Sequence, residues 1–160
     1  LGGSEYLKVL FDKTEGKPPV LDRKKEKQVQ EFCLELIQKG LIQSAHDCSE
    51  GGLAIAVAES CFAAPEETLG AKLELESTLR GDTLLFSESQ SRIVISFPEE
   101  LTDQIKNLAL SYNVDFSLIG ITGGSKFTVS INGQEYIKQE IESIKNIWKT
   151  SLGRYAGQTT

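Results

Sequence analysis

The stretch "HDCSEGGLAIAVAES", residues 46–60, joins a polar segment that contains two glycines to an apolar segment. The apolar part predicts a buried helix, and the first backbone N–H groups of a helix lack partners within it. Ser49, Gly51 and Gly52 stand at this predicted helix start, where glycine lets an anion approach the backbone and the helix dipole favours negative charge. The pattern predicts a phosphate-binding turn. In the alternative interpretation, Ser49 only caps the helix and the glycines form a strand-to-helix turn.

Three side chains beside this turn are candidates for chemistry. Asp47 could bind a divalent cation, because Mg²⁺ favours one or two carboxylates together with phosphate oxygens, or it could be a second capping residue. His46 is the only histidine of the chain. It could act as a general acid or base, or it could hydrogen-bond a nearby carbonyl. Cys48 could be accessible, but no activating base other than His46 is evident, which disfavours a role as nucleophile.

A second polar segment lies in "LLFSESQSRIVISF", between two apolar runs. Glu88, Ser89 and Gln90 precede a predicted strand, where amide, hydroxyl and carboxylate groups can orient a polar ligand. Arg92 could fork onto a phosphate or a carboxylate. The alternative is a solvated turn in which Arg92 forms a salt bridge.

Helices and strands must position these segments. Apolar residues at helical spacing predict helices over 5–11, 23–39, 52–62, 99–111 and 134–152, and alternating or β-branched runs predict strands over 41–45, 71–76, 92–98, 115–122 and 126–133. Gly123-Gly124 predicts a hairpin between the last two strands, Asn132-Gly133 predicts a tight turn, and residues 63–70 read as a loop.

This mixture predicts an α+β fold, with a mixed or antiparallel sheet and helices packed mainly on one face. We expect an N-terminal arm and linker over 1–20, the α+β domain over 21–153 and a tail over 154–160.

Composition narrows the possible function classes. A chain of 160 residues can bury a core without disulfides or metals, and no apolar run approaches the roughly 20 residues that span a bilayer. The net charge of −6 disfavours a nucleic-acid-binding surface. The three cysteines show no metal-binding spacing, which fits a reducing cytoplasm. Because the chain lacks methionine and begins Leu-Gly-Gly, we expect it to be a piece of a longer protein.

Three stretches together carry a family resemblance: "LGGSEYL" at 1–7, "HDCSEGGLAIAVAES" at 46–60 and "LLFSESQSRIVIS" at 84–96. In this order they resemble the C-terminal domain of the synthetase part of phosphoribosylformylglycinamidine synthases, over nearly the whole chain. The second stretch alone is similar to a wider superfamily that includes aminoimidazole ribonucleotide synthetase, and the other two narrow the resemblance to the purine enzyme.

The resemblance implies a domain of an ATP-dependent ligase of de novo purine biosynthesis. Members of this family convert formylglycinamide ribonucleotide to its amidine with ATP, Mg²⁺ and ammonia from a glutaminase partner. They activate the amide oxygen as an iminophosphate, from which ammonia displaces phosphate. We therefore expect a cytoplasmic protein whose partners are the ATP-binding domains of the same parent enzyme, a glutaminase domain or subunit and the ribonucleotide, with no nucleic acid or membrane partner.

The resemblance also implies roles for particular residues. Asp47 matches a Mg²⁺ ligand of the family, and Glu88, Ser89 and Gln90 match a run that contacts the ribonucleotide. The chain corresponds to the second of two tandem α+β domains, so these positions belong either to the active site or to an auxiliary nucleotide site. The principal catalytic histidine is expected elsewhere in the parent enzyme, and the isolated piece is expected to be inactive.

Three other functions stay open at this point. The chain could be a small-ligand regulatory module, since α+β domains serve many unrelated functions. It could be the C-terminal domain of another synthetase of the same superfamily. It could also be a scaffold that only positions residues of neighbouring domains.

Overall fold

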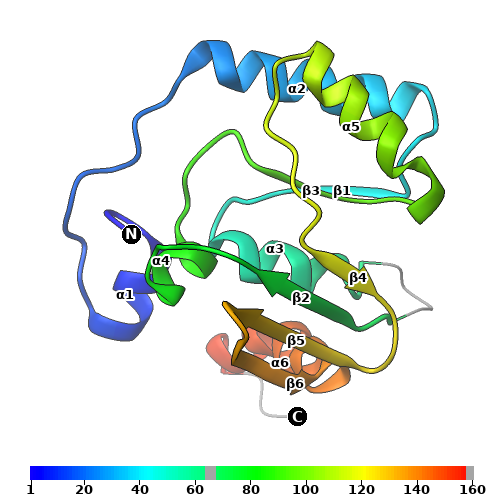
Figure 1. Cartoon of the computed structure of the whole chain (residues 1–160). Helices are drawn as coiled ribbons and strands as arrows, with labels where there is room; N and C mark the ends of the chain where they lie inside the picture. Colours follow the sequence, from blue (N-terminus) through cyan, green and yellow to red (C-terminus); the bar gives the residue numbers. More distant parts are fainter. Residues whose placement is uncertain (64–67, 158–160) are drawn as a thin grey trace. The chain divides into compact units, whose positions relative to one another are not determined.

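The computed structural model describes residues 1–63 and 68–157 and divides the chain into two compact units (Figure 1). Unit 1 consists of residues 1–60 and 79–118, and unit 2 consists of residues 61–78 and 119–160. Residues 64–67 of the predicted loop and residues 158–160 of the predicted tail lie outside the described residues. No helix within the described residues is long and apolar enough to cross a membrane.

Unit 1 contains five α-helices among its described residues: α1 (Glu5–Phe11), α2 (Arg23–Gln38), α3 (Gly52–Ser60), α4 (Gly81–Phe86) and α5 (Thr102–Ser111), the last preceded by a 3-10 turn, η1 (Glu99–Leu101). The predicted helices over 5–11 and 23–39 are confirmed, and that over 99–111 corresponds to η1 and α5. Ser4 caps α1, and Asp22 caps α2 by accepting hydrogen bonds from two backbone amides. The sequence did not predict α4, because a helix of six residues is too short for an apolar repeat.

The core of unit 1 lies between α2 and α5. It contains Phe32 and Leu36 of α2, Leu41 after α2, and Ile105 and Ala109 of α5. The i, i+4 spacing within each helix places these side chains on the facing sides, and α2 and α5 lie side by side at the top of Figure 1.

Unit 1 also holds a two-stranded antiparallel sheet of β1 (Ser44–Asp47) and β3 (Ile93–Ser96). The predicted strand over 41–45 is displaced toward the C-terminus. The cause is the end of α2, where Gly40 adopts a φ of 64° and the Leu41 amide donates to the carbonyl of Leu36. Leu41 therefore still belongs to the helix cap, and β1 begins at Ser44 and ends at Asp47.

Unit 2 is a four-stranded mixed sheet of β2 (Ala71–Leu75), β4 (Gly120–Thr122), β5 (Lys126–Ile131) and β6 (Gln134–Glu140), followed by α6 (Ile141–Tyr155). The strand order is β4-β2-β5-β6, with β2 parallel to β5 and the other neighbours antiparallel. The α+β class is therefore confirmed, with the strands divided between an antiparallel and a mixed sheet.

Two predictions for unit 2 are wrong. Residues 134–140 form β6 and not the start of the last helix, because Asn132 and Gly133 adopt φ values of 51° and 79°, which suit a tight hairpin turn, and return the chain alongside β5. The predicted hairpin around Gly123-Gly124 does not form, because β2 lies between β4 and β5.

Candidate functional site

The two polar segments of the sequence leave the same end of the β1–β3 ladder. Asp47, the last residue of β1, pairs with Ile93, the first residue of β3. One residue further, the Cys48 amide donates to the Arg92 carbonyl at 2.9 Å. Antiparallel pairing thus places residues 48–51 beside residues 87–92, and the structure brings together segments that are far apart in the sequence.

The carboxylate of Glu88 joins three segments at this end of the ladder. Its Oε1 atom accepts a hydrogen bond from the Gly51 amide at 2.8 Å and another from the Glu5 amide at 3.0 Å. Each of the three residues comes from one of the three stretches that carry the family resemblance. The sequence predicted Glu88 as a ligand contact and gave no sign of these two bonds, since a carboxylate reveals its partners only when the fold is known.

Gly51 and Gly52 make the turn from β1 into α3. They adopt φ values of 77° and 65°, which L side chains rarely adopt. A Cβ on Gly52 would lie 2.5 Å from the carbonyl oxygen of Ser87, so the turn packs directly against the end of α4. The Gly52 amide donates to the Ser49 carbonyl at 3.1 Å. Both glycine amides therefore have acceptors within the protein, as in the strand-to-helix-turn interpretation.

Arg92 stabilises the loop that precedes it through hydrogen bonds to its carbonyl groups. Its Nη2 atom donates to the Ser87 carbonyl, and its Nε atom lies 3.4 Å from the Ser89 carbonyl. Ser91 adopts a φ of 63° and donates its hydroxyl to Oε2 of Glu26, in α2, at 2.7 Å. The loop is thus held by its own arginine and by α2.

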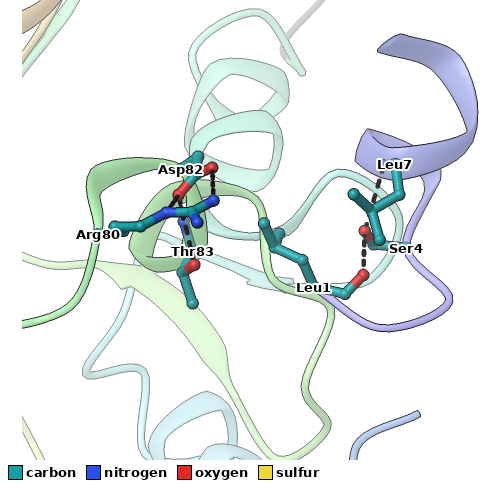
Figure 2. A network of polar contacts seen from close by, with 6 residues as sticks. All are labelled: Leu1, Ser4, Leu7, Arg80, Asp82 and Thr83. Atoms are coloured by element: carbon teal, nitrogen blue, oxygen red, sulfur yellow. Dashed lines mark hydrogen bonds and ion pairs between the residues drawn. The ribbon is translucent and has the colours of Figure 1, made fainter. Parts of the chain in front are cut away.

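The start of α4 is fixed by a second arginine (Figure 2). Arg80 donates from both Nε and Nη2 to the carboxylate of Asp82, and the Thr83 amide donates to the same carboxylate at 2.7 Å. The hydrogen bonds from Arg80 hold the pKa of Asp82 below its ordinary value. These bonds orient α4, whose last turn leads into the loop of residues 87–92. Figure 2 also shows Ser4 at the start of α1, where its hydroxyl donates to the Leu1 carbonyl at 2.7 Å.

Four predicted site residues keep side chains open to a ligand. Asp47, Ser49 and Gln90 are exposed and Ser89 is half-buried. Among the residues that the structure describes, these four side chains make no hydrogen bond or ion pair. They supply one carboxylate, one amide and two hydroxyls around the end of the ladder, a set that can orient a polar ligand.

His46 is engaged at both ring nitrogens. Its Nε2 atom lies 3.2 Å from Oε2 of Glu59, and its Nδ1 atom lies 2.7 Å from the Asp47 carbonyl oxygen. The carbonyl contact agrees with the structural alternative for this residue. Sequence patterns did not predict a role for Glu59, although it is the only charged residue in α3 and a lone charge in an apolar helix is a usable signal.

Cys48 is buried, with 6% of its surface exposed, although the sequence left accessibility open. Burial raises the pKa of its thiol, an effect that the charge of Arg92 opposes and that of Asp47 reinforces. A protonated, buried thiol is a poor nucleophile at neutral pH.

A metal centre made only of protein ligands is not found in the described part of the chain, where no group of three or more histidine, cysteine or acidic residues could hold an ion. Asp47 alone fits the mode in which Mg²⁺ takes one carboxylate and completes its shell with phosphate oxygens and water.

The chain is similar in sequence to one protein family and to named proteins of known sequence. Residues 1–132 match the family described as "AIR synthase related protein, C-terminal domain". The chain is 45% identical over 152 residues to the phosphoribosylformylglycinamidine synthase subunit PurL of Moorella thermoacetica. It is 42% identical over 149 residues to that of Caldanaerobacter subterraneus. These matches cover 95% and 93% of the chain but 20% of each relative, so the chain spans about a fifth of their length.

Solved structures share the fold. A structure described as Thermotoga maritima PurL complexed with FGAR matches 85% of this chain and 23% of its own, with a TM-score of 0.72 and 22% identity. A structure of T. maritima PurL complexed with ATP matches 77% of this chain and 22% of its own, with a TM-score of 0.68 and 23% identity. A third, described as PurLQS from Thermotoga maritima, matches 88% of this chain and 24% of its own, with a TM-score of 0.67 and 21% identity.

Proposed function

The chain belongs to the family of AIR synthase related proteins, whose C-terminal domain it matches, and from this premise we propose that it is the last synthetase domain of a phosphoribosylformylglycinamidine synthase. The observation that carries the proposal is identity of 42–45% to two PurL subunits over more than nine-tenths of the chain. The proposed parent enzyme makes formylglycinamidine ribonucleotide from formylglycinamide ribonucleotide, ATP and ammonia in purine biosynthesis.

The proposed contribution of this domain is to bind and orient a phosphorylated ligand. Ser49, Ser89 and Gln90 present hydroxyl and amide groups at the end of the β1–β3 ladder. Asp47 is the proposed carboxylate ligand of a Mg²⁺ ion that the ligand brings with it, and the ion would neutralise phosphate charge. Gly51, Gly52, Glu88 and Arg92 make contacts within the same two loops, and their proposed part is to hold these side chains in position.

The proposed partners follow from the same premise. Relatives described as complexed with ATP and with FGAR support binding of a nucleotide and of the ribonucleotide by the parent enzyme. The structure described as PurLQS supports a multi-subunit parent, in which we propose a glutaminase partner that delivers ammonia. We propose a cytoplasmic enzyme, and in it the ATP-binding domains of the same polypeptide are the neighbours of this domain.

The test uses the complete polypeptide that carries this chain. Incubated with formylglycinamide ribonucleotide, ATP, Mg²⁺ and an ammonium salt, it is expected to form the amidine and one phosphate per turnover. Ammonium replaces the glutaminase, so the assay needs no partner subunit. Absence of ribonucleotide-dependent phosphate release by a folded, complete polypeptide would contradict the proposal.

A scaffold role is the second candidate, and a specific observation favours it. Glu88, Arg92 and the amides of Gly51 and Gly52 all make contacts within unit 1. A scaffold needs those contacts but does not need the open side chains of Asp47 and Gln90. Replacing Asp47 or Gln90 in the complete enzyme separates the two, because only the ligand-binding role predicts altered kinetic constants.

A further inference from the structure

The contacts of Glu88 lead to a role that neither the family resemblance nor the proposed reaction assigns. We propose that Glu88 is a positioning residue: one carboxylate oxygen ties the start of α1 and the glycine turn before α3 to the loop that presents Ser89 and Gln90. The bonded amides belong to Glu5 and Gly51, which lie 83 and 37 positions away in the sequence.

Both amides need an acceptor from outside their own helix. The Glu5 amide is at the first residue of α1, and the Gly51 amide lies just before α3, so neither has an acceptor within its own helix. A carboxylate suits both positions, because charge-assisted hydrogen bonds are stronger than neutral ones and negative charge is favoured at a helix start.

The helix α1 lies at the surface of unit 1. None of its residues is buried. The Glu5–Glu88 hydrogen bond joins it to the segment around α4, as does stacking of Tyr6 on Phe86, with ring centroids 5.0 Å apart and planes 17° apart. In Figure 1, α1 and α4 lie side by side. The hydrogen bond to Glu88 thus fixes the backbone at the start of α1, and the stacked rings fix its side.

The Gly51 amide is also the donor that a bound phosphate would use. The Oε1 atom of Glu88 occupies the position at the Gly51 amide that a phosphate oxygen would take at a binding turn. The internal carboxylate and a bound phosphate therefore compete for one donor. Ser89 and Gln90, which follow Glu88 directly, are left to contact the ligand, and Glu88 acts through them. This competition rests on the proposed function, whereas the two hydrogen bonds to Glu88 do not.

The experiment measures backbone hydrogen exchange by mass spectrometry in the complete polypeptide, together with the Michaelis constant for the ribonucleotide. The variants are Glu88→Ala, Glu88→Gln and Glu88→Asp. Glutamine keeps a carbonyl acceptor at the same reach without charge, and aspartate keeps the charge on a shorter side chain. Glu100→Ala is the matched control, since Glu100 is an exposed acid of unit 1 whose side chain makes no hydrogen bond or ion pair within the described residues.

The proposal predicts that Glu88→Ala raises exchange about tenfold in the peptides that contain Glu5 and Gly51, since opening becomes easier where a hydrogen bond is lost. Glu88→Gln raises exchange less than Glu88→Ala, because it keeps an acceptor but loses the charge, and Glu88→Asp is more perturbed than Glu88→Gln. The Michaelis constant follows the same order, and Glu100→Ala changes neither readout.

Two results would overturn the proposal. One is unchanged exchange of both peptides in Glu88→Ala. The other is a ribonucleotide constant that worsens more in Glu88→Gln than in Glu88→Asp while exchange stays normal, which would mean that the charge contacts the ligand directly. If Glu88→Ala does not fold, the exchange rates and Michaelis constants of Glu88→Gln and Glu88→Asp still test the proposal by their order. Exchange is independent of turnover, so failure of the proposed reaction is seen separately.

Discussion

His46 and Glu59 face each other between β1 and α3, with Nε2 of the histidine 3.2 Å from Oε2 of the glutamate. The sole histidine of the chain therefore links the strand that ends at Asp47 to the helix behind the glycine turn. This contact, the hydrogen bonds to Glu88 and those from Arg92 connect the polar loops to one another, to α1 and to α3. Several polar side chains of the same loops stay exposed.

We predict a favourable coupling between His46 and Glu59. In a double-mutant cycle with His46→Ala and Glu59→Ala, the coupling free energy of unfolding is expected to be about 0.5–1 kcal/mol, typical of a partly exposed side-chain hydrogen bond. Denaturant titration measures it. Strict additivity of the two substitutions would mean that the contact contributes nothing.

The glycine turn gives a prediction about backbone shape and space. Gly52→Ala combines a φ of 65° with a Cβ 2.5 Å from the Ser87 carbonyl, whereas Gly40→Ala combines a φ of 64° with open space. Gly40→Ala is the control. It is expected to lower the free energy of unfolding by about 1–2 kcal/mol, the cost of a non-glycine residue in the left-handed conformation. Gly52→Ala should cost at least about 1 kcal/mol more, because backbone must move. Equal losses in the two variants would contradict the close approach of the turn to α4.

The cysteines predict a pH dependence of stability. Burial raises the pKa of Cys61 to about 11 and also raises the pKa of Cys48, from an ordinary value of 9.0. A raised folded-state pKa contributes stability that is fully present below pH 9 and is lost as pH rises toward the folded value, because the unfolded thiol ionises first. Each thiol should lower the free energy of unfolding by at most about 1 kcal/mol per pH unit in this window.

Unfolding titrations between pH 8 and about 11 test this dependence. The wild type is compared with a variant that carries serine at Cys48 and Cys61. The slope against pH, and not the absolute stability, is the readout, since the substitutions themselves alter packing. An unchanged slope in the serine variant would show that other groups cause any loss at high pH.

The sequence predicted the α+β class and several helices, because Ser4, Asp22 and the apolar repeats of α2 and α5 act locally. It failed where partners are distant. The strand β6 owes its conformation to pairing with β5, and the position of β2 between β4 and β5 cannot be read from local alternation.

The candidate site shows the same division. The residue types of Asp47, Ser89 and Gln90 pointed to a polar ligand before the fold was known. The sequence could not show that Glu88 accepts from the amides of Glu5 and Gly51, because those partners come from distant parts of unit 1. Arg92 instead bonds carbonyls of its own loop, which local spacing alone does not reveal. The polar segments therefore contain both exposed polar side chains and residues that make internal contacts.

The most direct test of the central claim is the nucleotide titration of the complete polypeptide with Mg²⁺ present, comparing the wild type with Asp47→Asn. Asparagine matches aspartate in shape and lacks its charge, and the side chain of Asp47 makes no hydrogen bond or ion pair within the part of the chain that the structure describes. If the end of the β1–β3 ladder is a ligand face, one class of nucleotide site weakens about tenfold, equivalent to about 1.4 kcal/mol, without loss of thermal stability. Identical stoichiometry and dissociation constants in the two proteins would contradict the claim and leave the scaffold role.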